Sequence, residues 1–212
     1  LAKAIKSVEP YANVFGMSAY GFSEYYNMQA SLDWNALKGN YGWYLDYYLD
    51  KFRVESAKAN KRLLDVLDLH WYPEVYEPIN GQTDWTRRVT RSDLNDSVYL
   101  NKARVQIPRT LWDPSYLEPG WIAEGYSSYL PLIPRLKESI DKYNPGTKLS
   151  FSEFNYGGEG QITGGIAMAD VLGIFGKYGI HAANYWKMVK NVSDAPYTTA
   201  AFKLYNNYDG NK

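Results

Sequence analysis

Cysteine is absent from the 212 residues, which excludes disulfide bonds, a thiolate nucleophile and zinc sites that need thiolate ligands. Only two histidines are present, so a metal site built on histidine is not expected either. The 23 basic residues balance 23 acidic ones without a long run of one sign, which argues against nucleic acid or an anionic membrane as a partner. No apolar run reaches the length of a membrane span. We therefore expect no cofactor, no metal, no nucleic acid and no membrane partner.

Aromatic residues are what the chain has in excess, with 21 Tyr and 7 Trp. Aromatic rings combine a flat apolar face with polar edges, so they suit stacking on sugar rings as well as core packing. At least half of them are expected to pack in the core. The lack of cysteine fits a secreted bacterial protein, and because no signal peptide is recognised, any export signal would be removed or lie outside this chain.

Hydrophobic periodicity predicts alternating strands and helices. The expected strands are residues 13–18, 63–70, 149–154 and 181–186, and the expected helices are residues 1–8, 40–60, 130–143, 165–177 and 198–205. The helix at residues 1–8 has no capping residue before it, so we expect it to begin upstream. Residues 20–34 are expected to form an aromatic loop and residues 74–125 to be mostly loop; loops of that length are usually functional.

This alternation is typical of parallel strands joined by crossover helices. A doubly wound sheet would carry a glycine-rich phosphate loop, and no G-x-G-x-x-G or P-loop string is present. A (β/α)8 TIM barrel fits better, because a carboxylate, a histidine and a tryptophan all fall at carboxyl ends of strands, where such barrels gather catalytic groups. Four strands are half of that barrel.

The stretch from 149 to 158, LSFSEFNYGG, contains the most informative carboxylate. With a period of two, Glu153 continues the face of Leu149 and Phe151 and reaches the end of the strand. A charged group there must be solvated or paired. It is therefore either a catalytic carboxylate or a partner in a structural ion pair.

Three strand ends bring polar and aromatic groups to one rim of the predicted barrel, at residues 70–72, 153–156 and 185–186. Alternation in the second strand places Asp68 and His70 on the inner face. Carboxylates beside aromatic platforms suit glycoside hydrolysis, in which one carboxylate attacks or stabilises an oxocarbenium-like centre. His70 could instead be structural and Trp186 could plug the barrel. The loop carboxylates are expected to be solvated, namely Glu24, Glu74 and Glu159.

Residues 150–186, 65–74 (DVLDLHWYPE) and 201–210 (AFKLYNNYDG) resemble glycoside hydrolase family 44. This resemblance implies an endo-acting β-1,4-glucanase that retains anomeric configuration and in several members also cleaves xyloglucan. It also implies an eight-stranded barrel followed by a β-sandwich. Residues 1–212 would then be strands five to eight of that barrel, with the first half-barrel and the sandwich outside this chain.

The resemblance makes Glu153 the nucleophile and aligns Trp186 and residues 70–72 with the family's aromatic positions. The substrate-binding set that we expect on this basis is His70, Trp71, Tyr72, Tyr156, Trp186 and Tyr20. One departure matters: the family's acid/base lies in an Asn-Glu-Pro string, which does not occur in this chain. The isolated chain would thus lack the acid/base.

Two alternatives remain open from the residues. One is a non-catalytic carbohydrate-binding domain that uses the aromatic rim alone. The other is a related barrel hydrolase that acts on mannan or xylan. In each case the expected partner is a polysaccharide, with β-glucan favoured, and the expected location is extracellular.

Overall fold

The structure is a computed structural model that describes residues 1–93 and 97–206. Residues 207–210 of the last stretch that resembles family sequences lie outside this description. The chain forms two compact units, the first made of residues 1–71, 135–154 and 180–184, and the second made of residues 72–134, 155–179 and those from 185 onward. Within the described ranges, no helix has the length and apolar character needed to cross a bilayer.

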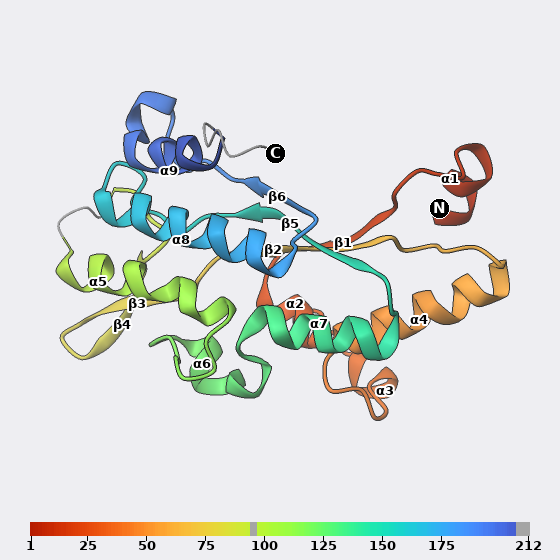
Figure 1. Cartoon of the computed structure of the whole chain (residues 1–212). Coiled ribbons are helices and arrows are strands. Elements are labelled where there is room, and N and C mark those ends of the chain that lie inside the picture. The colour runs from red at the N-terminus through yellow and green to blue at the C-terminus, as the bar shows by residue number, and fades with distance from the viewer. Residues whose placement is uncertain (94–96, 207–212) are drawn as a thin grey trace. The chain divides into compact units, whose positions relative to one another are not determined.

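The first unit contains a four-stranded sheet in the order β1-β2-β5-β6 (Figure 1). Its elements are α1 (Ala2–Val8), β1 (Phe15–Ala19), α2 (Phe22–Asn27), α3 (Trp34–Leu37), α4 (Tyr44–Ala59), β2 (Val66–Trp71), most of α7 (Leu132–Tyr143), β5 (Lys148–Phe154) and most of β6 (Ala182–Tyr185). β1 pairs with β2 and β2 pairs with β5, both in parallel. The predicted strand order and these two parallel pairings are confirmed.

The core of this unit lies between the sheet and its helices. Strand β2 has buried residues on both of its faces, as expected of a strand in the interior of a parallel sheet. Leu45 and Leu49 of α4 are fully buried. Trp43, just before α4, donates its indole N–H to Asp46 Oδ1 at 2.8 Å and to Ser139 Oγ of α7 at 3.0 Å. Through these bonds the buried ring joins α4 to α7.

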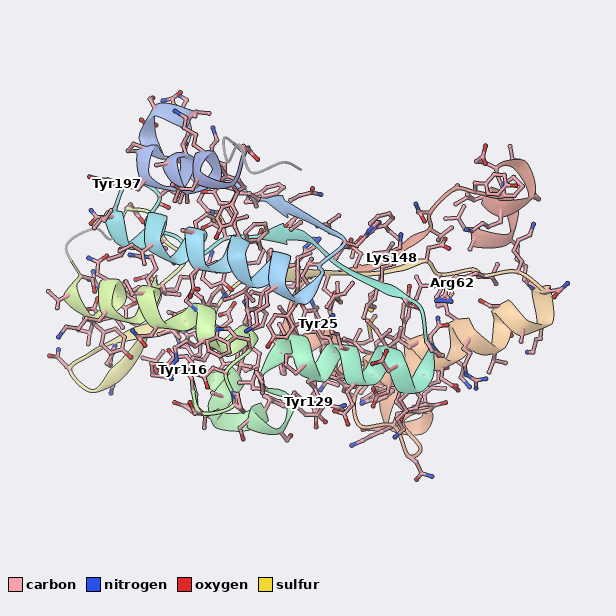
Figure 2. All side chains as sticks on the ribbon, in the orientation of Figure 1. Tyr25, Arg62, Tyr116, Tyr129, Lys148 and Tyr197 are labelled. Atoms are coloured by element: carbon pink, nitrogen blue, oxygen red, sulfur yellow. The ribbon has the colours of Figure 1, made fainter. Side chains whose placement is uncertain are left out.

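The second unit contains a two-stranded antiparallel sheet and a set of helices. Its elements are β3 (Tyr76–Ile79), β4 (Gln82–Arg88), α5 (Val98–Gln106), the 3-10 helix η1 (Ile107–Leu111), α6 (Trp121–Tyr126), η2 (Ser127–Tyr129), the start of α7, α8 (Ile162–Tyr178), η3 (Val192–Asp194) and α9 (Pro196–Asn206). Helices α8 and α9 lie side by side (Figure 1). A Cβ on Gly165 of α8 would lie 2.8 Å from Tyr197 Cβ (Figure 2), so glycine permits this close approach.

The β3–β4 hairpin corrects the expectation that residues 74–125 are mostly loop. Asn80 and Gly81 form its two-residue connection with φ of 51° and 76°. Two positive φ values fit the type I′ turn, for which Asn-Gly is the strongest short-range hairpin signal. Ser97 then starts α5 by accepting a hydrogen bond from Leu100 N–H at 3.0 Å, an N-cap that also ends the supposed loop.

The expectation of an aromatic loop at residues 20–34 is also wrong, because this segment contains α2. Burial decides the conformation there: Phe22 and Tyr25 are buried, and both rings lie on one side of the short helix. The helix expected at residues 40–60 begins later, at Tyr44, because Trp43 is extended with φ of −145°. The remaining predicted helices and strands are present, with ends that differ by a few residues.

Candidate active site

The adjacent ends of β2 and β5 bring His70 and Glu153 together in the first unit. The two residues are paired in the register of the sheet, and His70 Nδ1 lies 3.3 Å from Glu153 Oε2. The side chains are 16% and 29% exposed, so both remain accessible to a small ligand. This pair places a carboxylate and an imidazole at the carboxyl ends of neighbouring parallel strands.

A bulge in β5 decides which face carries Glu153. Leu69 pairs with Phe151, but His70 pairs with Glu153, so Ser152 is an extra residue on the β5 side. A bulge of this kind reverses the alternation beyond it. The prediction that Glu153 shares the face of Leu149 and Phe151 is therefore wrong, because Glu153 faces the same side as His70. The predicted shared face of Asp68 and His70 agrees with their contacts.

Asp68 ties three strands together beneath this pair. Its Oδ2 accepts from Ser18 Oγ of β1 at 2.7 Å and from Ser152 Oγ of β5 at 2.6 Å. Its Oδ1 accepts from Ser152 N–H at 3.1 Å and from the Ser150 hydroxyl. Asp68 is 2% exposed, and these donors compensate for the cost of burying its charge.

Helix α2 supports the same region from another side. The Tyr25 hydroxyl donates to the backbone carbonyl of His70 (Figure 2). Burial raises the pKa of Tyr25 well above its usual value, and the carboxylates of Asp68 and Glu24 raise it further. The hydroxyl thus remains a donor and fixes the β2 end. Glu24 is not merely solvated, since its Oε2 accepts from Tyr20 N–H at 2.5 Å.

The turn that follows β5 is organised in the second unit by Glu159. This residue is fully buried, and its Oε1 accepts from Asn155 Nδ2 at 3.1 Å, from Met188 N–H at 2.9 Å and from the Tyr185 hydroxyl. Ser92 Oγ donates to Oε2 at 3.0 Å. The expectation that Glu159 is solvated is wrong: a buried carboxylate with four donors replaces its lost hydration internally.

This network holds the segment that carries Trp186. Asn155 Nδ2 also donates to the Trp186 carbonyl at 2.5 Å, while its Oδ1 accepts from Gly157 N–H. The Trp186 side chain is 52% exposed. Trp186 is therefore a ring on a fixed backbone with a face open to solvent, and it does not plug a core within the described structure.

Arg104 fixes the other side of the turn. It is 1% exposed and donates to the carbonyls of Val89 at 2.9 Å and Tyr156 at 3.1 Å. Desolvation lowers the pKa of Arg104 to about 10, so the group is still protonated at neutral pH. A Cβ on Gly158 would lie 2.6 Å from the guanidinium, which together with a φ of 58° explains why glycine stands there.

Known proteins are similar to this chain along its whole length. Residues 1–75 match the model of glycoside hydrolase family 44. Endoglucanase A of Paenibacillus lautus is 52% identical over 212 residues, which are all of this chain and 29% of that protein. The chain belongs to glycoside hydrolase family 44.

Two further relatives are similar to this chain over nearly its whole length. A Paenibacillus polymyxa xyloglucanase, solved with xyloglucan, superposes with a TM-score of 0.90 at 52% identity over 99% of this chain and 39% of that one. A β-mannanase/endoglucanase A of Caldicellulosiruptor saccharolyticus is 46% identical over 99% of this chain and 16% of that protein. The family 44 chain described here thus spans less than half the length of each relative.

The predicted substrate-binding residues separate into exposed and buried side chains. Tyr20 is 70% exposed, and Tyr72 and His70 are half-buried. Trp71 and Tyr156 are each 1% exposed and are packed inside their units, and that they take part in substrate binding stays a prediction. That Tyr156 and Trp186 converge with Glu153 on one cavity stays a prediction.

Sequence reasoning missed the supporting carboxylates rather than the central one. Ser150 and Ser152 flank Phe151, so two small hydroxyl side chains alternate with an apolar one in this strand. That pattern could have predicted hydrogen bonds from these serines to a carboxylate on the neighbouring strand, which is Asp68. No comparable signal pointed to Glu159, because its donors come from positions 92, 155, 185 and 188. Among the residues described, no group of three or more His, Asp or Glu side chains could hold a metal ion.

Glu118 is a further buried carboxyl group, and it differs from Asp68 and Glu159 in its hydrogen bonding. Thr110 Oγ1 donates to its Oε2 at 2.9 Å, whereas Oε1 has no hydrogen-bond partner in the described part of the chain. Burial raises the pKa of Glu118 to about 7; the Thr110 hydrogen bond opposes this shift, and the charge of Glu74 adds to it. Folding therefore favours the protonated form.

The raised pKa of Glu118 predicts that the free energy of unfolding decreases between about pH 4.5 and pH 7. A carboxyl whose pKa is raised on folding carries no penalty below its unfolded pKa, and the penalty grows until the folded pKa is passed. Each pH unit between the two values corresponds to about 1.4 kcal/mol, so the loss is at most about 3.5 kcal/mol. Urea unfolding of Glu118→Gln should show a flatter dependence on pH than the native chain, while the exposed control Glu138→Gln should not. If the free energy of unfolding depended on pH in the same way for the native chain and for both variants, the raised pKa could not be assigned to Glu118.

Proposed function

We propose that this chain carries the nucleophile of a secreted, endo-acting glycoside hydrolase that cleaves internal β-1,4-glucosidic bonds of cellulose-type glucans or xyloglucan with retention. The observation that supports this most is Glu153 at the carboxyl end of β5, within 3.3 Å of His70, in a family 44 chain. A polysaccharide is too large to enter a bacterial cell, which supports an extracellular location.

The proposed reaction has two displacements. A carboxylate oxygen of Glu153 attacks the anomeric carbon, and the bond from that carbon to the leaving oxygen breaks as an acid protonates this oxygen. Water then attacks the same carbon, gives its proton to the conjugate base and releases Glu153. His70 Nδ1 orients the Glu153 carboxylate. The exposed rings of Trp186 and Tyr20, together with Tyr72, are proposed to contact sugar rings, and the expected roles of Trp71 and Tyr156 in substrate binding remain a prediction.

We further propose that β1, β2, β5 and β6 are strands five to eight of a (β/α)8 barrel. Their parallel pairing and sequential order support this. Because no Asn-Glu-Pro string occurs in the chain, the acid/base is proposed to come from a part of the protein outside these residues. The β-sandwich that the family resemblance implies is likewise proposed to lie outside them.

A second substrate class has one specific observation in its favour. The Caldicellulosiruptor saccharolyticus relative is named as both a β-mannanase and an endoglucanase. Mannan differs from cellulose in the orientation of one hydroxyl group, so the same carboxylate chemistry serves both backbones. Cellulose-type glucan or xyloglucan remains the preferred proposal, because a solved relative holds xyloglucan.

The purified 212-residue chain should show little or no hydrolysis of soluble β-glucan. General acid–base assistance typically contributes 10²–10⁴-fold to such reactions, and this chain is proposed to lack that group. Reducing-sugar release is the measurement, with the whole protein as the positive control. Robust turnover would mean that a second carboxylate lies within the chain, with Glu24 and Glu74 the first to replace.

A further inference from the structure

A cavity of about 350 Å³ lies within the second unit, between the β3–β4 hairpin and α6. Its walls include four aromatic side chains and two polar ones: Tyr76, Trp85, Tyr99, Trp121, Thr83 and Glu124. Its volume falls near the lower end of the range of about 300–1,000 Å³ that small-molecule sites occupy. None of these residues belongs to the site described above, although Tyr76 bonds to Glu74.

We propose that this cavity, the hairpin pocket, binds pyranose rings of the β-linked polysaccharide and is centred on Trp85. The identity of the sugar rests on the proposed function, whereas the existence of a binding site rests on the geometry of the pocket. The site adds a sugar contact on the β3–β4 hairpin to those at the strand ends.

Two rings form an aromatic corner in the pocket. Tyr76 and Trp85 have centroids 4.8 Å apart and planes inclined at 65°, so they present faces in different directions. Trp85 is 65% exposed, whereas Trp34, Trp43 and Trp71 are at most 5% exposed. A β-linked pyranose has flat faces of C–H groups, and covering an exposed indole with such a face removes apolar area from water.

Polar groups complement the equatorial hydroxyls of such a ring. Glu124 lies in the first turn of α6 and is exposed, and Thr83 adds a hydroxyl from β4. A carboxylate accepts hydrogen bonds from vicinal hydroxyls, and a threonine hydroxyl can donate or accept. The negative charge of Glu124 disfavours phosphates and other anions, which leaves a neutral polyhydroxylated ligand as the class that fits.

The pocket is held in place before any ligand arrives. The Tyr76 hydroxyl donates to Glu74, which fixes the ring, and Arg87 forms an ion pair with Glu77 at 2.6 Å across the hairpin. The backbone of Val75 pairs with that of Gly120, and a Cβ on Gly120 would lie 2.6 Å from the Glu74 carbonyl oxygen. Little side-chain freedom is then lost on binding, which favours affinity.

The test is the binding of cellohexaose and of a xyloglucan oligosaccharide to the 212-residue chain, measured by calorimetry and by tryptophan fluorescence. Trp85→Ala should weaken binding on the order of tenfold, because the indole face supplies most of the apolar contact. Trp85→Tyr should stay within about threefold of the native chain, since a flat ring is restored. Tyr11→Ala is the control, an aromatic side chain that is 92% exposed and lies outside this pocket, and it should leave both the affinity and the fluorescence change unaltered.

Glu124→Ala provides a second variant that leaves the rings in place, and it should also weaken binding severalfold. Circular dichroism must show native-like folding for each variant that is compared. Equal affinity of Trp85→Ala and the native chain, or no sugar binding by the native chain, would overturn the hairpin pocket. Turnover by the whole protein with Glu153→Gln would instead overturn the proposed function, and the two failures are therefore distinguishable.

Discussion

Replacing Glu153 by Gln in the whole protein should lower kcat by at least about a thousandfold while leaving oligosaccharide Kd within about twofold. The amide keeps the shape of the carboxylate and its place beside His70, but it cannot attack the anomeric carbon. Binding depends mainly on rings and hydroxyl contacts, which the substitution preserves. Steady-state rates on soluble β-glucan, together with calorimetry on an oligosaccharide, measure the two quantities separately.

The role of Glu153 can be distinguished from that of an acid/base by its replacement with glycine. With an activated aryl β-glycoside, azide should enter the space left by the carboxylate and give the α-glycosyl azide, because a single displacement inverts configuration. Loss of an acid/base would instead give the β-product through the intact nucleophile. Glu138→Gln, an exposed carboxylate at 69%, is the matched control and should be unaffected. Near-normal turnover by Glu153→Gln, or a β-azide product, would remove Glu153 from the nucleophile role.

Replacing Asp68 by Ala should destabilise the folded chain by about 3 kcal/mol or more. The substitution removes an acceptor for four donors that come from Ser18, Ser150 and Ser152, and it leaves the donors of buried Ser150 and half-buried Ser152 without this acceptor. For a chain of this size the loss corresponds to a fall in Tm of roughly 10 °C. Thermal and urea unfolding followed by circular dichroism provide the measurement.

Two related variants separate the charge from the packing at Asp68. Asp68→Asn keeps the shape and one acceptor, so it should cost less than Asp68→Ala. Ser152→Ala removes one hydroxyl donor and should cost about 1 kcal/mol. If Asp68→Ala unfolds at the same temperature as the native chain, the three-strand tie contributes nothing to stability, and another explanation is needed for a buried carboxylate there.

The strands of the parallel sheet were predictable because each is a short apolar run with few alternatives. Burial on both faces of β2 leaves a continuous hydrophobic signature, and α4 shows its buried stripe at Leu45 and Leu49. The hairpin was predictable in principle from Asn80-Gly81, but the polar and aromatic residues around it read as loop. Its strands are largely exposed, so they lack the apolar alternation that identifies a half-buried strand.

The sequence by itself determined the four strands, most of the helices and the placing of His70 and Glu153 at neighbouring strand ends, because period and parallel order follow from local patterns. Only the tertiary structure decided which way Glu153 faces, since one extra residue at Ser152 reverses the alternation and register depends on the partner strand. The same holds for the environment of Glu159, whose four donors are up to 67 residues away along the chain. Burial of a charge is set by what packs around it, and residues so distant meet only in the folded chain.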